Sequence, residues 1–193
     1  MSINIIYQRF IGVVPEPYKI CMGKLYSVVP NNITYSYENN LNYCHNCDTR
    51  AASDVERIEL LYRNPNGMWA DCDILPLCNE IYLPEKSGKP YLFNWNGKSD
   101  VQVVIGNGCK KVFGDILEKI KNGSIHIHAG WLQKYINDGN IDCYIIPNGY
   151  YEHLSLGMML GCTGWEEISN GACTMKNDKG EISVYVRGKK LCP

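Results

Sequence analysis

Cys44 and Cys47 form a short motif whose spacing has a direct chemical meaning. Two thiolates three positions apart can bind one metal ion from a tight turn, and Zn²⁺ prefers four such ligands in a tetrahedron. Cys72 and Cys78 follow in sequence and could complete the set, although their spacing is wider than the usual gap of about two to four residues. We therefore expect a structural zinc site at Cys44, Cys47, Cys72 and Cys78. A disulfide or redox pair and ordinary free thiols are the alternatives.

Three histidines and a glutamate form a second set of candidate metal ligands. His126 and His128 alternate with isoleucines, so on a strand both imidazoles would project from one face while the isoleucines enter the core. Glu152 and His153 follow later in the chain. The rival hypothesis is therefore a metal-dependent hydrolase with His126, His128 and His153 as ligands and Glu152 as acid and base. The simpler interpretation is the polar face of a half-exposed strand.

Part of this histidine pattern resembles a known family. His126-x-His128 with Gln133, followed by Pro147-x-Gly149 with His153, is similar to the two metal-binding motifs of the cupin family. Too few residues separate Gln133 from Pro147 for the pair of strands that cupins place there. We therefore carry no cupin activity over to this chain.

Composition and charge narrow the class of protein. With 193 residues, 45% hydrophobic and 20% charged, the chain has the composition of a soluble globular protein. The net charge of -1 gives no support for nucleic-acid binding, and no apolar run approaches the roughly 20 residues that cross a bilayer. The first ten residues lack the pattern of a secretory signal, so we expect a cytoplasmic or otherwise intracellular protein with reduced thiols.

Patterns of tyrosine, β-branched residues and Asn-Gly turns predict a chain rich in strands. Strands are expected at 19–29, 80–83, 91–95, 100–105, 124–128, 140–146, 172–176 and 181–187. The strands at 91–95 and 100–105 are expected to pair across Asn96-Gly97 as a hairpin, and those at 172–176 and 181–187 to pair as a second hairpin near the end of the chain. Helices are expected at 110–121 and 131–137, whereas residues 54–63 suit either a helix or a strand.

These elements predict an α+β fold. It has a mainly antiparallel sheet, one or two short helices in the second half and a cysteine knuckle in the first half. We expect a single domain over residues 1–193, with a possible division into a cysteine-bearing part at 1–79 and an α+β part at 80–193.

The function that follows by elimination is not enzymatic. We expect the chain to bind another macromolecule, most simply a protein partner, with the zinc site stabilising its fold. A third hypothesis is a secreted, disulfide-stabilised binding protein whose leader has been removed, because ten cysteines would also fit bridges.

Overall fold

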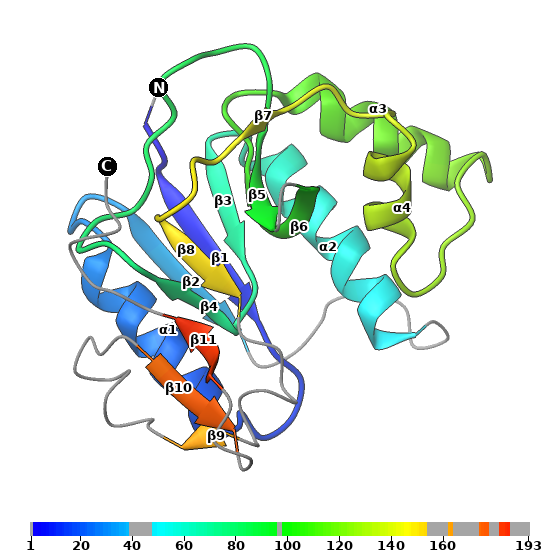
Figure 1. Cartoon of the computed structure of the whole chain (residues 1–193). Coiled ribbons are helices and arrows are strands. Elements are labelled where there is room, and N and C mark those ends of the chain that lie inside the picture. Colours follow the sequence, from blue (N-terminus) through cyan, green and yellow to red (C-terminus); the bar gives the residue numbers. More distant parts are fainter. Residues whose placement is uncertain are drawn as a thin grey trace. The chain divides into compact units, whose positions relative to one another are not determined.

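The computed structural model describes residues 2–38, 48–95, 98–153, 162–163, 174–177 and 182–185 (Figure 1). The chain forms two compact units, each assembled from separate segments. The first unit comprises Met1–Gly12, Asn32–Ala70 and Leu83–Ile146, and the second comprises Val13–Asn31, Asp71–Tyr82 and Pro147–Pro193. In the parts of the chain described, no helix combines the length and the apolar character that a membrane span requires.

The first unit contains a six-stranded mixed sheet in the order β2-β1-β3-β6-β5-β7. Its strands are β1 (Ile5–Arg9), β2 (Thr34–Glu38), β3 (Gly67–Ala70), β5 (Tyr91–Trp95), β6 (Lys98–Ile105) and β7 (Tyr144–Ile145). β1 pairs in parallel with both β2 and β3, and β5 pairs in parallel with β7. β6 is antiparallel to β3 and to β5.

The prediction of an α+β fold with a mainly antiparallel sheet is therefore wrong. Most of the pairings in this sheet are parallel, and the described part of the chain contains four helices, so the arrangement is α/β. The expected strand at 19–29 is not formed, because residues 19–28 belong to helix α1 (Glu16–Val28). Cys21 and Leu25, one helical turn apart, are both fully buried. A helix between β1 and β2 allows the two strands to run in parallel.

Helix α2 (Thr49–Arg63) resolves the ambiguous segment at 54–63. The helix begins earlier than its apolar pattern indicated, because the Asp48 side chain accepts hydrogen bonds from the backbone N–H groups of Arg50 and Ala51 at 2.8 and 3.3 Å. It connects β2 to β3 and thereby permits the second parallel pairing.

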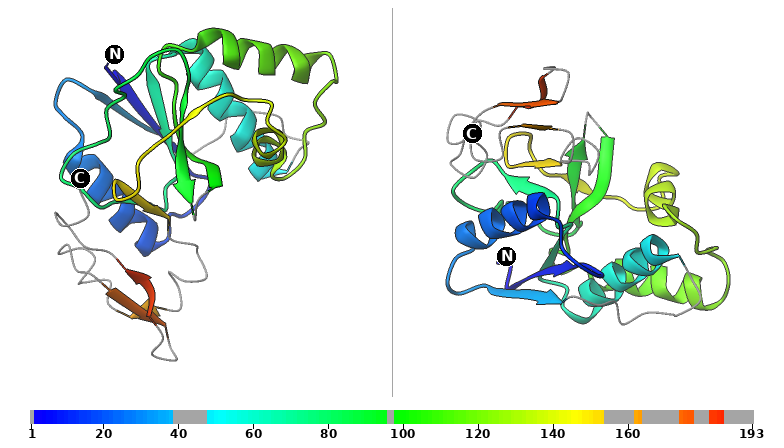
Figure 2. Two further views of the ribbon diagram at one scale, coloured as in Figure 1. Left: turned by 45° about the horizontal axis from the view of Figure 1, so that its top comes forward. Right: turned by 90° about the horizontal axis from the view of Figure 1, so that it is seen from below.

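The predicted helices at 110–121 and 131–137 are confirmed as α3 (Lys110–Lys121) and α4 (Trp131–Asn137). Figure 2 shows α3 beside α2 within the first unit. The three helices and the sheet share one apolar core, in which Ile58 of α2, Phe113 of α3, Trp131 of α4 and Trp69 of β3 are almost fully buried. The predicted hairpin is also confirmed, since β5 and β6 are antiparallel neighbours.

The second unit contains α1 and two small antiparallel sheets. β4 (Ile74–Pro76) pairs with β8 (Tyr151–His153). β9 (Cys162–Thr163), β10 (Thr174–Asn177) and β11 (Ile182–Tyr185) form the other sheet, which confirms the predicted pairing of two strands near the end of the chain. The expected strands at 80–83 and 124–128 are not formed.

Candidate functional site

Two carboxylates lie in the turn that joins β3 to β4. Asp71 is the first residue after the buried strand β3, and Asp73 precedes β4. The backbone N–H of Ile74 donates to the carbonyl oxygen of Asp71 at 3.2 Å, which closes the turn. Cys72 between them is 5% exposed, whereas Asp71 and Asp73 are both partly exposed. We call Asp71, Cys72 and Asp73 the acidic turn.

His153 of β8 lies against the acidic turn. The antiparallel register pairs Ile74 with His153, so the imidazole comes next to the residue that precedes β4. Its Nε2 is 3.0 Å from Oδ2 of Asp73, and the two side chains are only 10% and 15% exposed. A contact this short and this shielded holds the Asp73 carboxylate in one orientation.

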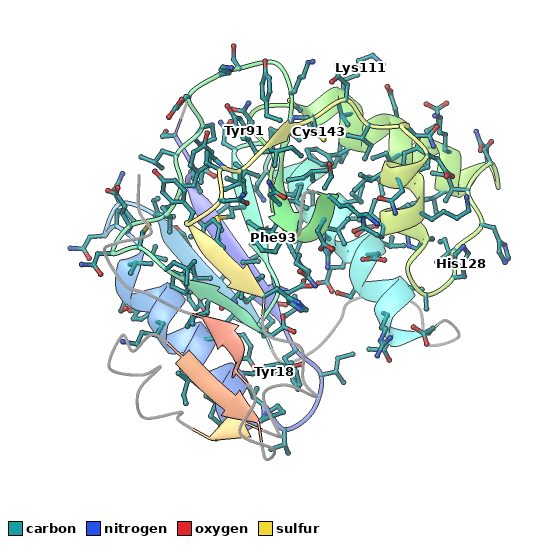
Figure 3. The ribbon with its side chains drawn as sticks, viewed as in Figure 1. Tyr18, Tyr91, Phe93, Lys111, His128 and Cys143 are labelled. Carbon is teal, nitrogen blue, oxygen red and sulfur yellow. The ribbon has the colours of Figure 1, made fainter. Side chains whose placement is uncertain are left out.

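Helix α1 adds two protonated groups to the same unit. Burial and, after it, the charge of Asp73 raise the pKa of Tyr18 to about 12. Burial, followed by the charge of Asp73, also raises the pKa of the Cys21 thiol to about 12. At neutral pH the phenol is therefore a hydrogen-bond donor, and the thiol is not a nucleophile. Figure 3 shows Tyr18 on α1.

The acidic turn can bind a cation or accept hydrogen bonds from hydroxyl groups, because carboxylates are acceptors for both. The described residues contain no group of three or more His, Cys, Asp or Glu side chains that could hold a metal ion by themselves. A cation bound here would therefore need further ligands from water or from a bound substrate.

The predicted four-sulfur site falls partly outside the described residues. Cys44 and Cys47 belong to that undescribed part. Cys72 is a buried free thiol in the acidic turn, whereas Cys78 is buried after β4 and is disulfide-bonded, with its sulfur 3.3 Å from the carbonyl oxygen of Gly149. The assignment of these four cysteines as ligands stays a prediction.

The alternative metal site relied on a strand at 124–128 that is not formed. His126 and His128 lie in the loop between α3 and α4 rather than on a strand, with their ring centroids 6.2 Å apart. Their alternation with isoleucines was interpreted correctly, since Ile125 and Ile127 pack against the core while both histidines are exposed. His153 instead pairs with Asp73 in the second unit.

The predicted acid and base of the hydrolase, Glu152, pairs with Leu75 in the ladder of β4 and β8.

A solved structure shares this fold. The crystal structure of a glycosyltransferase involved in the glycosylation of the major capsid of PBCV-1 matches this structure with a TM-score of 0.50 and 12% sequence identity. The match covers 86% of this chain and 98% of the glycosyltransferase chain. At such low identity the likeness concerns the fold alone. No protein-family model matches the sequence, and no curated protein does.

The predicted function, a non-enzymatic binding protein stabilised by zinc, is contradicted. A solved structure with the same fold is that of a glycosyltransferase, and the described residues offer no metal-binding group for zinc or for the rival metal-dependent hydrolase. Sequence reasoning also missed the acidic turn, because it considered Cys72 as a ligand and ignored its neighbours. The sequence did contain a signal for this turn, because the apolar run at 67–70 is followed directly by Asp71-Cys72-Asp73.

Proposed function

We propose that the chain is a glycosyltransferase, an enzyme that transfers a sugar from a nucleotide-sugar donor to an acceptor. The observation that carries the proposal is the acidic turn, which begins at the carboxyl end of β3 in a sheet whose fold a glycosyltransferase shares. In open α/β sheets, ligands bind outside the carboxyl ends of the strands. Asp71 is the first residue after such an end.

The chemistry of the donor explains why two carboxylates would be useful there. A nucleotide sugar carries a negatively charged diphosphate, which carboxylates repel unless a divalent cation lies between them. Mg²⁺ is commonly held by one or two carboxylates together with substrate phosphates and several waters. Asp71 and Asp73, both partly exposed and two positions apart, fit this requirement without a third protein ligand. Bound with the donor, the cation would neutralise charge on the departing diphosphate.

The remaining residues of the unit position these carboxylates. His153 fixes the orientation of Asp73 through the 3.0 Å contact between Nε2 and Oδ2. Tyr18 stays protonated at neutral pH because burial raises its pKa to about 12, so it adds no further negative charge near the carboxylates. The buried Cys21 thiol is likewise neutral.

Calorimetric titration with uridine and guanosine diphosphate, with and without Mg²⁺ or Mn²⁺, tests the proposal on the full chain. We expect binding that requires the cation and that weakens roughly tenfold or more in Asp71→Asn and Asp73→Asn, because each variant removes one charged ligand. Asp115→Asn is the matched control, since Asp115 is exposed and pairs with Lys111 on α3.

A second assay measures release of sugar from uridine- and guanosine-diphosphate sugars. The proposal predicts slow transfer of the sugar to water, with the nucleoside diphosphate as the other product. Binding that is independent of the cation, or that survives in both turn variants, would contradict the assignment. Release of inorganic phosphate instead of sugar would indicate a phosphohydrolase.

A further inference from the structure

A groove with polar and apolar lining lies between α3, α4 and the loop that connects them, all within the first unit. Its volume of about 430 Å³ lies in the range of small-molecule sites. The polar and aromatic side chains that line it include Lys119, His126, His128, Lys134, Tyr135 and Asp138. Figure 3 shows His128 on the loop and Lys111 towards the opposite end of α3.

The backbone holds the loop in place at both of its ends. The N–H of Ile125 donates to the carbonyl oxygen of Lys119 at 3.1 Å, which ties the loop to the last turn of α3. The N–H of Trp131 donates to the carbonyl oxygen of His128 at 3.0 Å, at the start of α4. Between these bonds, Ile125 and Ile127 pack against the core and leave both imidazoles exposed at the groove. These bonds therefore fix where the loop lies against the ends of α3 and α4.

The lysines that belong to α3 and α4 differ in their partners. Lys111 and Lys134 each lie 2.6 Å from a carboxylate, of Asp115 and Asp138 respectively. Lys119 instead donates to the hydroxyl of Tyr135 at 2.9 Å, and this neutral group does not cancel its charge. The same hydrogen bond raises the pKa of Lys119, so its ammonium group stays charged at neutral pH.

We propose that this groove binds a small phosphate-bearing ligand, with Lys119 as the charge partner of the phosphate and His126 as a hydrogen-bond donor to it. The Nδ1 atom of His128 lies 2.9 Å from the carbonyl oxygen of Ala129, so a neutral His128 donates there and adds no second donor to the phosphate. The lining contains two lysines and two histidines against one aspartate, and that aspartate is already paired with Lys134. The phosphate source is a sugar phosphate or free inorganic phosphate. The site does not depend on the proposed glycosyltransferase activity, because none of its residues belongs to the acidic turn.

Calorimetric titration of the full chain with glucose 1-phosphate, inorganic phosphate and glucose tests the inference, without nucleotide or divalent cation. We expect the phosphate-bearing probes to bind and to weaken at high salt, and glucose to bind far more weakly. Lys119→Gln should weaken phosphate binding roughly tenfold or more, as the loss of one charge-assisted contact predicts. Lys111→Gln removes the same charge from the same helix outside the groove and should change binding less than about twofold.

The titrations also distinguish the two sources of phosphate. Tighter binding of glucose 1-phosphate than of inorganic phosphate assigns the groove to a sugar phosphate, whereas equal binding assigns it to the free anion. NMR spectra of the imidazole C–H groups should show shifts at His126 and His128 on addition of the ligand. Three results would overturn the proposal: no binding of either phosphate probe, equal losses in the two lysine variants, or binding of glucose as strong as that of its phosphate. Thermal unfolding of both variants checks that each remains folded.

Discussion

Replacement of Arg57 by methionine should destabilise the first unit strongly, because this cation is buried together with its partner. Arg57 and Asp54 of α2 are only 3% and 7% exposed, and Nη1 of Arg57 lies 3.4 Å from Oδ1 of Asp54. The same Nη1 donates to the carbonyl oxygen of Val101 at 2.7 Å, and the guanidinium lies 4.9 Å from the centre of the Trp69 ring. Arg57→Met keeps much of the side-chain volume and removes the charge.

The expected loss in the free energy of unfolding is about 3–5 kcal/mol, the usual cost of breaking a buried ion pair from one side. About 1.5–3 kcal/mol of this corresponds to the charged hydrogen bond to Val101. The rest arises from the Asp54 carboxylate, which would stay buried without its cation. Burial already raises the pKa of Asp54 while Arg57 lowers it, so the pKa should rise further in the variant.

Urea unfolding followed by circular dichroism measures the effect. The stability deficit of Arg57→Met should shrink as the pH falls from about 7 towards 4, because protonation of Asp54 removes the uncompensated charge. Adding Asp54→Asn to Arg57→Met should recover part of the loss at neutral pH for the same reason.

Arg63→Met on the same helix is the matched control. Arg63 is exposed and pairs with Glu59 at 3.0 Å, so its loss should lower the free energy of unfolding by less than about 0.5 kcal/mol. A loss below about 1 kcal/mol in Arg57→Met, or a double variant no more stable than the single one, would refute this account of the buried pair.

Two further predictions concern alkaline pH and close backbone packing. The folded chain holds the Tyr18 proton more tightly than the unfolded chain does, because the pKa of Tyr18 is raised to about 12 in the fold. The contribution of the protonated Tyr18 to the free energy of unfolding is therefore complete below about pH 10 and is lost as the pH rises through about 12. Tyr18→Phe should therefore lose less stability than the wild type across that interval, as urea midpoints at both ends would show, and equal losses would contradict the raised pKa. A Cβ at Gly106 would lie 2.4 Å from the carbonyl oxygen of Pro65, so Gly106→Ala should lower the free energy of unfolding by about 1–3 kcal/mol. An unchanged thermal midpoint would contradict that close approach.

Local patterns predicted several elements of the fold correctly. The apolar residues of α3 recur at helical spacing, and its C-cap residue, Asn122, is followed by Gly123 with a φ of 78°, a conformation that glycine adopts readily. The alternation of Ile125 and Ile127 with two histidines predicted which side chains face the core, although no strand forms there. These signals need only neighbouring residues, so they can be recognised without the rest of the chain.

The candidate site could not be predicted in the same way. His153 and Asp73 are 80 positions apart, and only the pairing of β4 with β8 brings them into contact. The sequence did contain the Asp-x-Asp pattern after an apolar run, but nothing local distinguishes a ligand-binding turn from a solvated one. Cys72, which lies between the two aspartates, was predicted to be a zinc ligand, and its side chain is buried in the structure.

The sequence alone therefore determined the helices at 110–121 and 131–137, the hairpin of β5 and β6, and the polar face of the histidine loop. Only the tertiary structure decided that β1 runs parallel to β2 and β3, and that the fold is consequently α/β. The physical reason is that helical periodicity and tight turns are properties of adjacent residues. The direction of strand pairing depends instead on segments about 30 positions or more apart and on the connections that join them.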